Sequence, residues 1–168
     1  MENLKLQFKS HQQSDIPLRV KWLNDERNNK YIGDEPGKKT TLKKQIQWFD
    51  GYKKDKNKIF FTIYHDKTPI GFMGFSNISK VNRLADIFIM IGNNDYKGKG
   101  WGKESMLYLI KHGFNKLNLQ KINLGVIEKN TPAVHLYKKL GFKVEGIFKK
   151  EVNINGKFHN MLSMAKFK

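Results

Sequence analysis

The sequence contains no cysteine. This absence excludes a disulfide scaffold, thiolate zinc sites, iron–sulfur ligation and a covalent acyl-cysteine intermediate. It is compatible with a cytoplasmic protein, which is the location we expect. No apolar run approaches the roughly 20 residues that a membrane-spanning helix needs, and residues 1–15 lack the apolar core of a signal peptide. We therefore expect neither a membrane partner nor a targeting segment.

Acidic residues and arginines are also scarce. The chain carries 32 lysines and arginines against 15 aspartates and glutamates, and only Arg19, Arg27 and Arg83 are arginines. Residues 1–84 hold 17 basic and 9 acidic side chains and residues 85–168 hold 15 and 6, so the net charge of +17 is evenly spread. Nucleic-acid readers usually rely on arginine forks as well as lysine. We therefore predict a lysine-rich surface that attracts anions, with no specific nucleic-acid partner.

The apolar residues suffice for a hydrophobic core. Hydrophobic side chains make up 39% and aromatic side chains 12% of 168 residues. No internal repeat or low-complexity linker divides the chain, so residues 1–168 are expected to form a single domain.

Apolar patterning alternates between strand and helix periods along the chain. Strands are expected at residues 4–8, 59–64, 70–78, 85–91 and 122–126, followed by two antiparallel strands after Phe142 that join at Asn155-Gly156. Helices are expected at residues 17–24, after Thr40 or Thr41, after Gly100, and after Asn130. The pattern predicts an α/β (α+β) fold, a mixed sheet with helices on both faces.

A glycine-rich segment lies between the apolar strand 85–91 and the helix that follows it. Its sequence is YKGKGWGK over residues 96–103. Glycines at alternate positions allow backbone N–H groups to converge without Cβ obstruction, and a helix N-terminus favours negative charge. The segment predicts a pyrophosphate cradle, with added charge from Lys97, Lys99 and Lys103. It matches neither a Walker A loop nor the dinucleotide fingerprint.

A second motif runs from Asn130 through Ala133 and Tyr137 to Gly141-Phe142. By itself it is also explained by ordinary helix structure, in which Asn130 caps the helix, Tyr137 packs on its apolar face and Gly141 ends it.

Together the two motifs resemble the GCN5-related N-acetyltransferases (GNAT), over residues 59–167 and more loosely before them. The resemblance implies acetyl-CoA as donor and a mostly antiparallel sheet that splays at the cofactor site, where strands ending near Ile91 and Ile127 admit the pantetheine arm. It implies a set of cofactor-binding residues: Ile91, Lys97, Gly98, Lys99, Gly100, Trp101, Gly102, Lys103 and Asn130. Lys97 departs from the family, which usually has glutamine or arginine there.

The resemblance also implies catalytic roles. Because the chain has no cysteine, acetyl is expected to move directly to the amine in a ternary complex. Tyr137 is the expected general acid at the departing thiolate. Asp86 and Glu128 are candidate bases, with a structural partner as the alternative role of Asp86 and with His135 and His159 as alternative bases. The histidines lack metal-ligand spacing, so no metal is expected.

Acidic residues near the N-terminus suggest where a cationic amine would bind. These are Asp25, Glu26, Asp34 and Glu35, and Trp22 lies beside them; the alternative is that the acids balance neighbouring lysines.

The chain resembles the bacterial spermidine acetyltransferases and also acetyltransferases that act on nucleotide-linked amino sugars, within a branch that includes enzymes modifying ribosomal proteins. A +17 protein attracts an anionic substrate better than a polycation. We therefore expect an amino sugar as acceptor, with a polyamine acceptor or a non-catalytic acyl-CoA-binding module as alternatives. The C-terminal edge strands are expected to be able to pair in a homodimer.

Overall fold

A seven-stranded sheet organises the protein in the computed structural model, which describes residues 6–32 and 35–168. The strands lie in the order β1-β2-β3-β4-β5-β7-β6. Only β4 and β5 pair in parallel, and every other neighbouring pair is antiparallel. The bounds are β1 Leu6–Ser10, β2 Ile59–His65, β3 Thr68–Ser79, β4 Leu84–Ile91, β5 Lys121–Ile127, β6 Lys143–Ile154 and β7 Lys157–Phe167. The expected mixed, mostly antiparallel sheet is confirmed; Leu4 lies outside the described residues.

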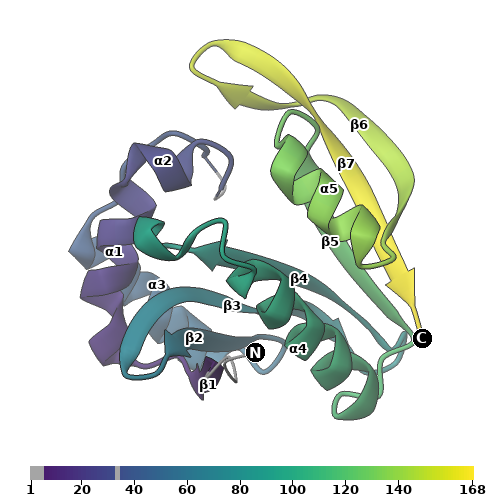
Figure 1. The fold of residues 1–168 in the computed structure, drawn as a ribbon, viewed down its shortest axis with the longest axis horizontal. Coiled ribbons are helices and arrows are strands. Elements are labelled where there is room, and N and C mark those ends of the chain that lie inside the picture. Colours follow the sequence, from purple (N-terminus) through teal and green to yellow (C-terminus); the bar gives the residue numbers. More distant parts are fainter. Residues whose placement is uncertain (1–5, 33–34) are drawn as a thin grey trace.

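Five α-helices flank the sheet, on both of its faces (Figure 1). They are α1 Ile16–Asn24, α2 Glu26–Asn29, α3 Leu42–Lys54, α4 Trp101–Asn115 and α5 Thr131–Lys139, and two 3₁₀ turns cover Gln13–Asp15 and Asn94–Tyr96. Thr41 caps α3, because its hydroxyl accepts a hydrogen bond from the Lys44 N–H at 3.2 Å. Within the described ranges, no helix is long and apolar enough to cross a membrane.

Successive side chains of a strand point to opposite faces of the sheet, so the hydrophobic core has two parts, one on each face. On one face Trp22 of α1 packs with Phe72 and Met90. The other face carries the main core, where Met73 of β3 belongs to the same buried cluster as Met106 of α4. Because both faces of β3 and β4 are covered, these strands are apolar along most of their length.

The parallel strands β4 and β5 pair with each other only over their first residues. The paired residues are Leu84 with Lys121, Ala85 with Ile122 and Asp86 with Asn123, and no further pairing follows. Beyond that point β4 continues beside β3 as far as Ile91, whereas β5 continues beside β7. Figure 1 shows the two strands spreading from their shared end near the C-terminus. The sheet therefore opens between residues 87–91 and 124–127.

A buried histidine makes the fold sensitive to acid. His11 is 4% exposed, and its Nδ1 lies 2.8 Å from the Thr62 hydroxyl, which donates to Asp15 at 2.7 Å. Burial, together with the nearby charge of Arg19, lowers the pKa of His11 from 6.5 to about 4. Between these two values the unfolded chain binds a proton that the folded chain excludes, so folding is stabilised fully above pH 6.5 and progressively less below it.

We expect the His11→Gln variant to lose part of this acid sensitivity. Between about pH 7 and about pH 5, His11 alone should lower the free energy of unfolding of the wild type by about 2 kcal/mol. Urea unfolding at both pH values measures the change, with His135→Gln as control because His135 is exposed on α5. Equal pH dependence in the wild type and His11→Gln would contradict the assignment to His11.

Candidate active site

Two cavities meet where the sheet opens. The strand-gap cavity, of about 360 Å³, is lined by both separated strands, by Gly102 of α4 and by the α5 residues Ala133, Leu136 and Tyr137. The α1–α3 cavity, of about 490 Å³, lies on the opposite face of β3 and β4. Ile32, Phe72 and Phe88 line both cavities. Two molecules could therefore reach the opening between β4 and β5 from opposite faces of the sheet.

The turn before α4 has the backbone of an anion-binding site. Gly98 and Gly100 have φ angles of +72° and +89°, in the left-handed region that side chains disfavour. The first hydrogen bond of α4 joins the Glu104 N–H to the Gly100 carbonyl at 3.1 Å. The preceding N–H groups of the first turn have no acceptor within the helix and lie at its positive end. These features fit the pyrophosphate of acetyl-CoA.

The lysines around this turn do not all face it. Lys97 Nζ donates to the Arg27 carbonyl at 3.2 Å and to the side-chain oxygen of Asn28, so the Lys97 side chain ties the turn to α2. Its partial burial lowers the pKa of Lys97. The charge that we expected from Lys97 at the pyrophosphate is thus directed elsewhere, because a backbone carbonyl and an amide oxygen hold the ammonium. Lys99 lies over the ring of Tyr96 at 5.8 Å, and Lys103 is exposed on α4.

Trp101 and Gly102 play different parts at the start of α4. The Trp101 ring is 7% exposed and lies edge-on to His65, with ring centroids 4.6 Å apart, so only its backbone can face a ligand. Gly102 lines the strand-gap cavity, and a Cβ at this position would lie 3.9 Å from both Ile91 and Leu136. Ile91 and Asn130 line the same cavity, between the separated strands where the resemblance to the family places the pantetheine arm.

Besides Tyr31, the ionisable side chain that lines the strand-gap cavity is that of Tyr137. Its ring packs edge-on against Phe142, with centroids 6.1 Å apart. Burial raises the pKa of Tyr137 to about 12. The hydroxyl therefore holds its proton at neutral pH and can donate it, as a general acid must.

Asp86 and Glu128 line neither cavity. Asp86 lies at the end of β4 that pairs with β5, and its carboxylate accepts a hydrogen bond from Asn77 at 2.7 Å. Glu128 accepts one from Asn160 at 3.0 Å. The structure therefore does not bring either predicted base to the opening, because Asp86 lies at the closed end of the strand pair and Glu128 follows β5 and is held by β7.

The predicted acidic cluster is not gathered at one site. Asp25 caps α2, accepts from the Arg27 guanidinium at 2.8 Å and from Asn94 at 2.7 Å, and these bonds hold its pKa well below the usual range. Glu26 is exposed and lines neither cavity. Asp25 thus joins α2 to the segment before the glycine turn.

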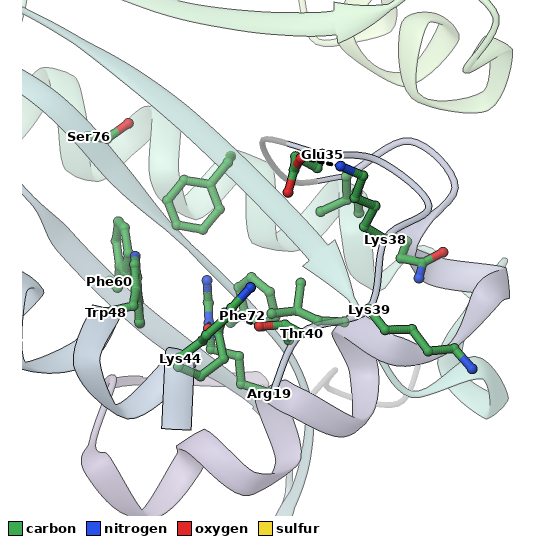
Figure 2. A pocket seen from close by; sticks show the side chains of 15 residues that line it. Arg19, Glu35, Lys38, Lys39, Thr40, Lys44, Trp48, Phe60, Phe72 and Ser76 are labelled. Atoms are coloured by element: carbon green, nitrogen blue, oxygen red, sulfur yellow. Dashed lines mark hydrogen bonds and ion pairs between the residues drawn. The ribbon is translucent and has the colours of Figure 1, made fainter. Parts of the chain in front are cut away.

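The remaining predicted substrate residues are also divided. Asp34 lies outside the described residues. Glu35 lines the α1–α3 cavity, where it is paired with Lys38 (Figure 2). Trp22 is 6% exposed and packs against Phe72 in the core, so its ring is structural.

The α1–α3 cavity contains side chains that the sequence did not point out. Figure 2 shows Arg19 near Trp48 and Phe72, on the side of the lining away from the Glu35–Lys38 pair. The one available signal was an arginine between the apolar residues Leu18 and Val20 of a predicted helix in an arginine-poor chain. In the described ranges, no three histidine, aspartate or glutamate side chains are placed to hold a metal ion.

The sequence and structure are similar to known acetyltransferases. Residues 5–143 match the family model described as the acetyltransferase (GNAT) domain. The spermidine N(1)-acetyltransferase of Escherichia coli (strain K12) is 34% identical over 119 residues, 71% of this chain and 63% of that protein, so the match spans less than two thirds of that relative.

Two other proteins add information on ligands. The structure of spermidine N-acetyltransferase from Vibrio cholerae in complex with CoA and spermine superposes with a TM-score of 0.90 at 26% identity, covering 98% of this chain and 96% of that one. An L-amino acid N-acetyltransferase of Escherichia coli (strain K12) is 33% identical over 87 residues, 52% of this chain and 53% of that protein.

Proposed function

The chain belongs to the GNAT family of acetyltransferases, and we propose that it transfers acetyl from acetyl-CoA to a primary amine of a small molecule. One arrangement carries the proposal. Gly102, in the first turn of α4 directly after the glycine turn, and Tyr137 both line the strand-gap cavity, in the opening between β4 and β5. This combination provides an anion site, an apolar slot and a proton donor.

The residues of the chain divide the work of transfer. Acetyl-CoA supplies the acetyl group as a thioester; the amine nitrogen forms the C–N bond as the C–S bond breaks, the amine loses one proton and the sulfur gains one. The N–H groups at the start of α4 bind the anionic end of the donor. Tyr137 holds a proton at its hydroxyl for the sulfur, and its burial keeps that proton in place at neutral pH. We assign the role of general base to neither Asp86 nor Glu128, because neither residue lines a cavity at the opening.

The acceptor amine is the finer part of the proposal. The spermidine acetyltransferases among the relatives favour a polyamine over the amino sugar that we expected from net charge. The L-amino acid N-acetyltransferase shows that a relative of this chain also accepts an amine that carries a carboxylate. The proposed activity is therefore N-acetylation of a small amine, with the polyamine as the acceptor that the named relatives favour most.

A thiol-release assay with acetyl-CoA tests the proposed activity. The acceptors are polyamines, amino sugars, aminoglycosides and peptide N-termini, each at the same concentration. We expect acceptor-dependent release of CoA with small amines and none with peptide N-termini. Binding of acetyl-CoA without release on any acceptor would overturn the proposal and favour a non-catalytic acyl-CoA-binding module.

A further inference from the structure

The α1–α3 cavity is unusual in the charge that it presents. Among the described residues its charged lining consists of Arg19, Lys38, Lys39, Lys44 and Glu35, and the one carboxylate of this set is already paired with Lys38. Arg19, Lys39 and Lys44 have no ion-pair partner among the described residues. The cavity thus attracts an anion and repels a polycation.

Arg19 is the buried member of this set. It is 9% exposed, and its guanidinium lies 4.0 Å from the ring centroid of Trp48 and 4.1 Å from that of Phe72. Its Nε donates to Gln45 at 2.9 Å, whereas its buried Nη1 has no hydrogen-bond partner among the residues that the structure describes. A buried guanidinium without a carboxylate is costly to maintain unless a ligand compensates it.

Asn29 provides a second free donor in the same cavity. The residue is 4% exposed, and its side-chain Nδ2 is buried without a hydrogen-bond partner in the described part of the chain. Buried donors in native proteins are normally satisfied, so two of them in one cavity point to an acceptor group supplied from outside the chain.

The cavity connects this donor pair to the proposed reaction site. Phe72 stacks on Arg19 and also lines the strand-gap cavity, as do Ile32 and Phe88, so the two cavities adjoin at these residues. The aromatic lining of Trp48, Phe60, Phe72 and Phe88 gives the body of a ligand an apolar surface. A molecule bound at Arg19 can therefore extend over Phe72 toward the opening between β4 and β5.

We propose that the α1–α3 cavity binds an acceptor that carries an anionic group, a carboxylate or a phosphate, in addition to its primary amine. Arg19 and Asn29 bind the anion, Lys44 adds charge at the cavity, and the amine reaches the strand gap. The inference rests on the proposed acetyltransferase function. The proposed acceptor differs from the substrate of the spermidine acetyltransferases. The described lining offers a polyamine only one carboxylate, that of Glu35, and this carboxylate is already paired with Lys38.

Matched acceptors test the proposal on the full chain. The carboxylate arm compares 5-aminopentanoate with pentylamine and cadaverine, and the phosphate arm compares O-phosphoethanolamine with ethanolamine; spermidine is run beside both. We expect kcat/KM to be at least about tenfold higher for an amine that carries the anionic group than for the matched amine that lacks it. Cadaverine or spermidine turning over faster than every anion-bearing amine would overturn the inference and leave the acetyltransferase function standing.

The Arg19→Gln variant assigns the effect to the cavity. It should lower kcat/KM for the anion-bearing amine by about 10- to 100-fold and by much less for the matched amine without the anion, so that the ratio of the two kcat/KM values falls. Lys43→Gln is the control, because it removes a charge next to Lys44 from an exposed position that does not line the cavity. An equal loss with neutral and anionic amines would mean that Arg19 serves only the packing of Trp48 and Phe72.

Binding of inorganic phosphate provides a test that needs neither turnover nor a folded variant. Phosphate is titrated into the wild type at constant ionic strength with saturating CoA, so that the glycine turn is occupied. Phosphate binding, with competitive inhibition against the acceptor if turnover is seen, supports the anion site even if no amine is acetylated. Absence of phosphate binding, together with no preference for anion-bearing amines, overturns it.

Discussion

Replacing Tyr137 with phenylalanine is expected to lower kcat by about 100-fold or more, the range that loss of a general acid produces. The KM of acetyl-CoA should change far less, because phenylalanine keeps the ring that packs against Phe142 at 6.1 Å. Steady-state kinetics with the best acceptor measures both constants. Since the pKa of Tyr137 is raised to about 12, its proton is retained through neutral and moderately basic pH, so deprotonation of Tyr137 should not limit wild-type activity there.

A matched control separates catalysis from packing in this experiment. Tyr108→Phe removes the same hydroxyl from α4, where the ring stacks on Phe8 with centroids 4.1 Å apart and lines neither cavity. It should leave kcat unchanged. If Tyr137→Phe were as active as Tyr108→Phe, Tyr137 would serve only to pack α5 against the strand that follows it.

Replacing Gly102 with leucine is expected to weaken acetyl-CoA binding by about 10- to 100-fold, because extra methylene groups in a packed site cost about 1–3 kcal/mol and about 1.4 kcal/mol is a factor of ten in affinity. A Cβ at Gly102 lies 3.9 Å from Ile91 and Leu136, so a larger side chain must enter the strand-gap cavity between them. Helix α4 itself should tolerate leucine, because leucine forms helices better than glycine. Calorimetric titration with CoA, together with thermal unfolding, separates lost binding from lost stability.

Two further variants show whether the size of the side chain is the cause. Gly102→Ala makes only ordinary van der Waals contacts and should bind CoA almost as well as the wild type. Gly51→Leu places leucine on α3 at a position where a Cβ would meet nothing within 4 Å, and it should leave binding unchanged. Wild-type affinity for CoA in Gly102→Leu would show that the cofactor does not occupy the strand-gap cavity.

The contrast between Arg19 and Tyr137 shows how the two cavities differ in chemistry. Tyr137 is an uncharged proton donor in an apolar slot, suited to the thioester side of the reaction. Burial lowers the pKa of Arg19 only to about 10, so it stays cationic at neutral pH on the opposite face of the sheet. The acceptor panel and the Tyr137 variants therefore examine different faces of the same opening, and a failure of one leaves the other interpretable.

Much of the local structure could be predicted, because its causes lie within a few residues. The Asn155-Gly156 pair adopts φ angles of +50° and +82° between β6 and β7, as a two-residue hairpin requires. Thr41 caps α3 through a bond to a residue three positions later. The glycine turn before α4 belongs to the same class, since its positive φ angles and helix N-terminus follow from adjacent residues.

The contacts that the sequence did not indicate join residues far apart in the chain. Lys97 was expected at the pyrophosphate, and in the structure its ammonium binds Asn28, 69 residues away. Asp86 was a candidate base with a structural partner as its alternative role, and strand pairing places it at the closed end beside Asn123. Patterns of charge and polarity along the sequence do not contain these distances, because they arise only when separate elements pack together.

The sequence by itself determined the order of strands and helices, the glycine turn and the tyrosine motif, and through the absence of cysteine it excluded an acyl-cysteine route. The net charge of +17 indicated only a general attraction for anions. Only the tertiary structure decided where that attraction is concentrated. Packing α1 and α3 against β3 buries Arg19 between Trp48 and Phe72 in a cavity that joins the strand gap. The charge that the cavity presents depends on this packing, since burial distinguishes Arg19 from the lysines on the surface.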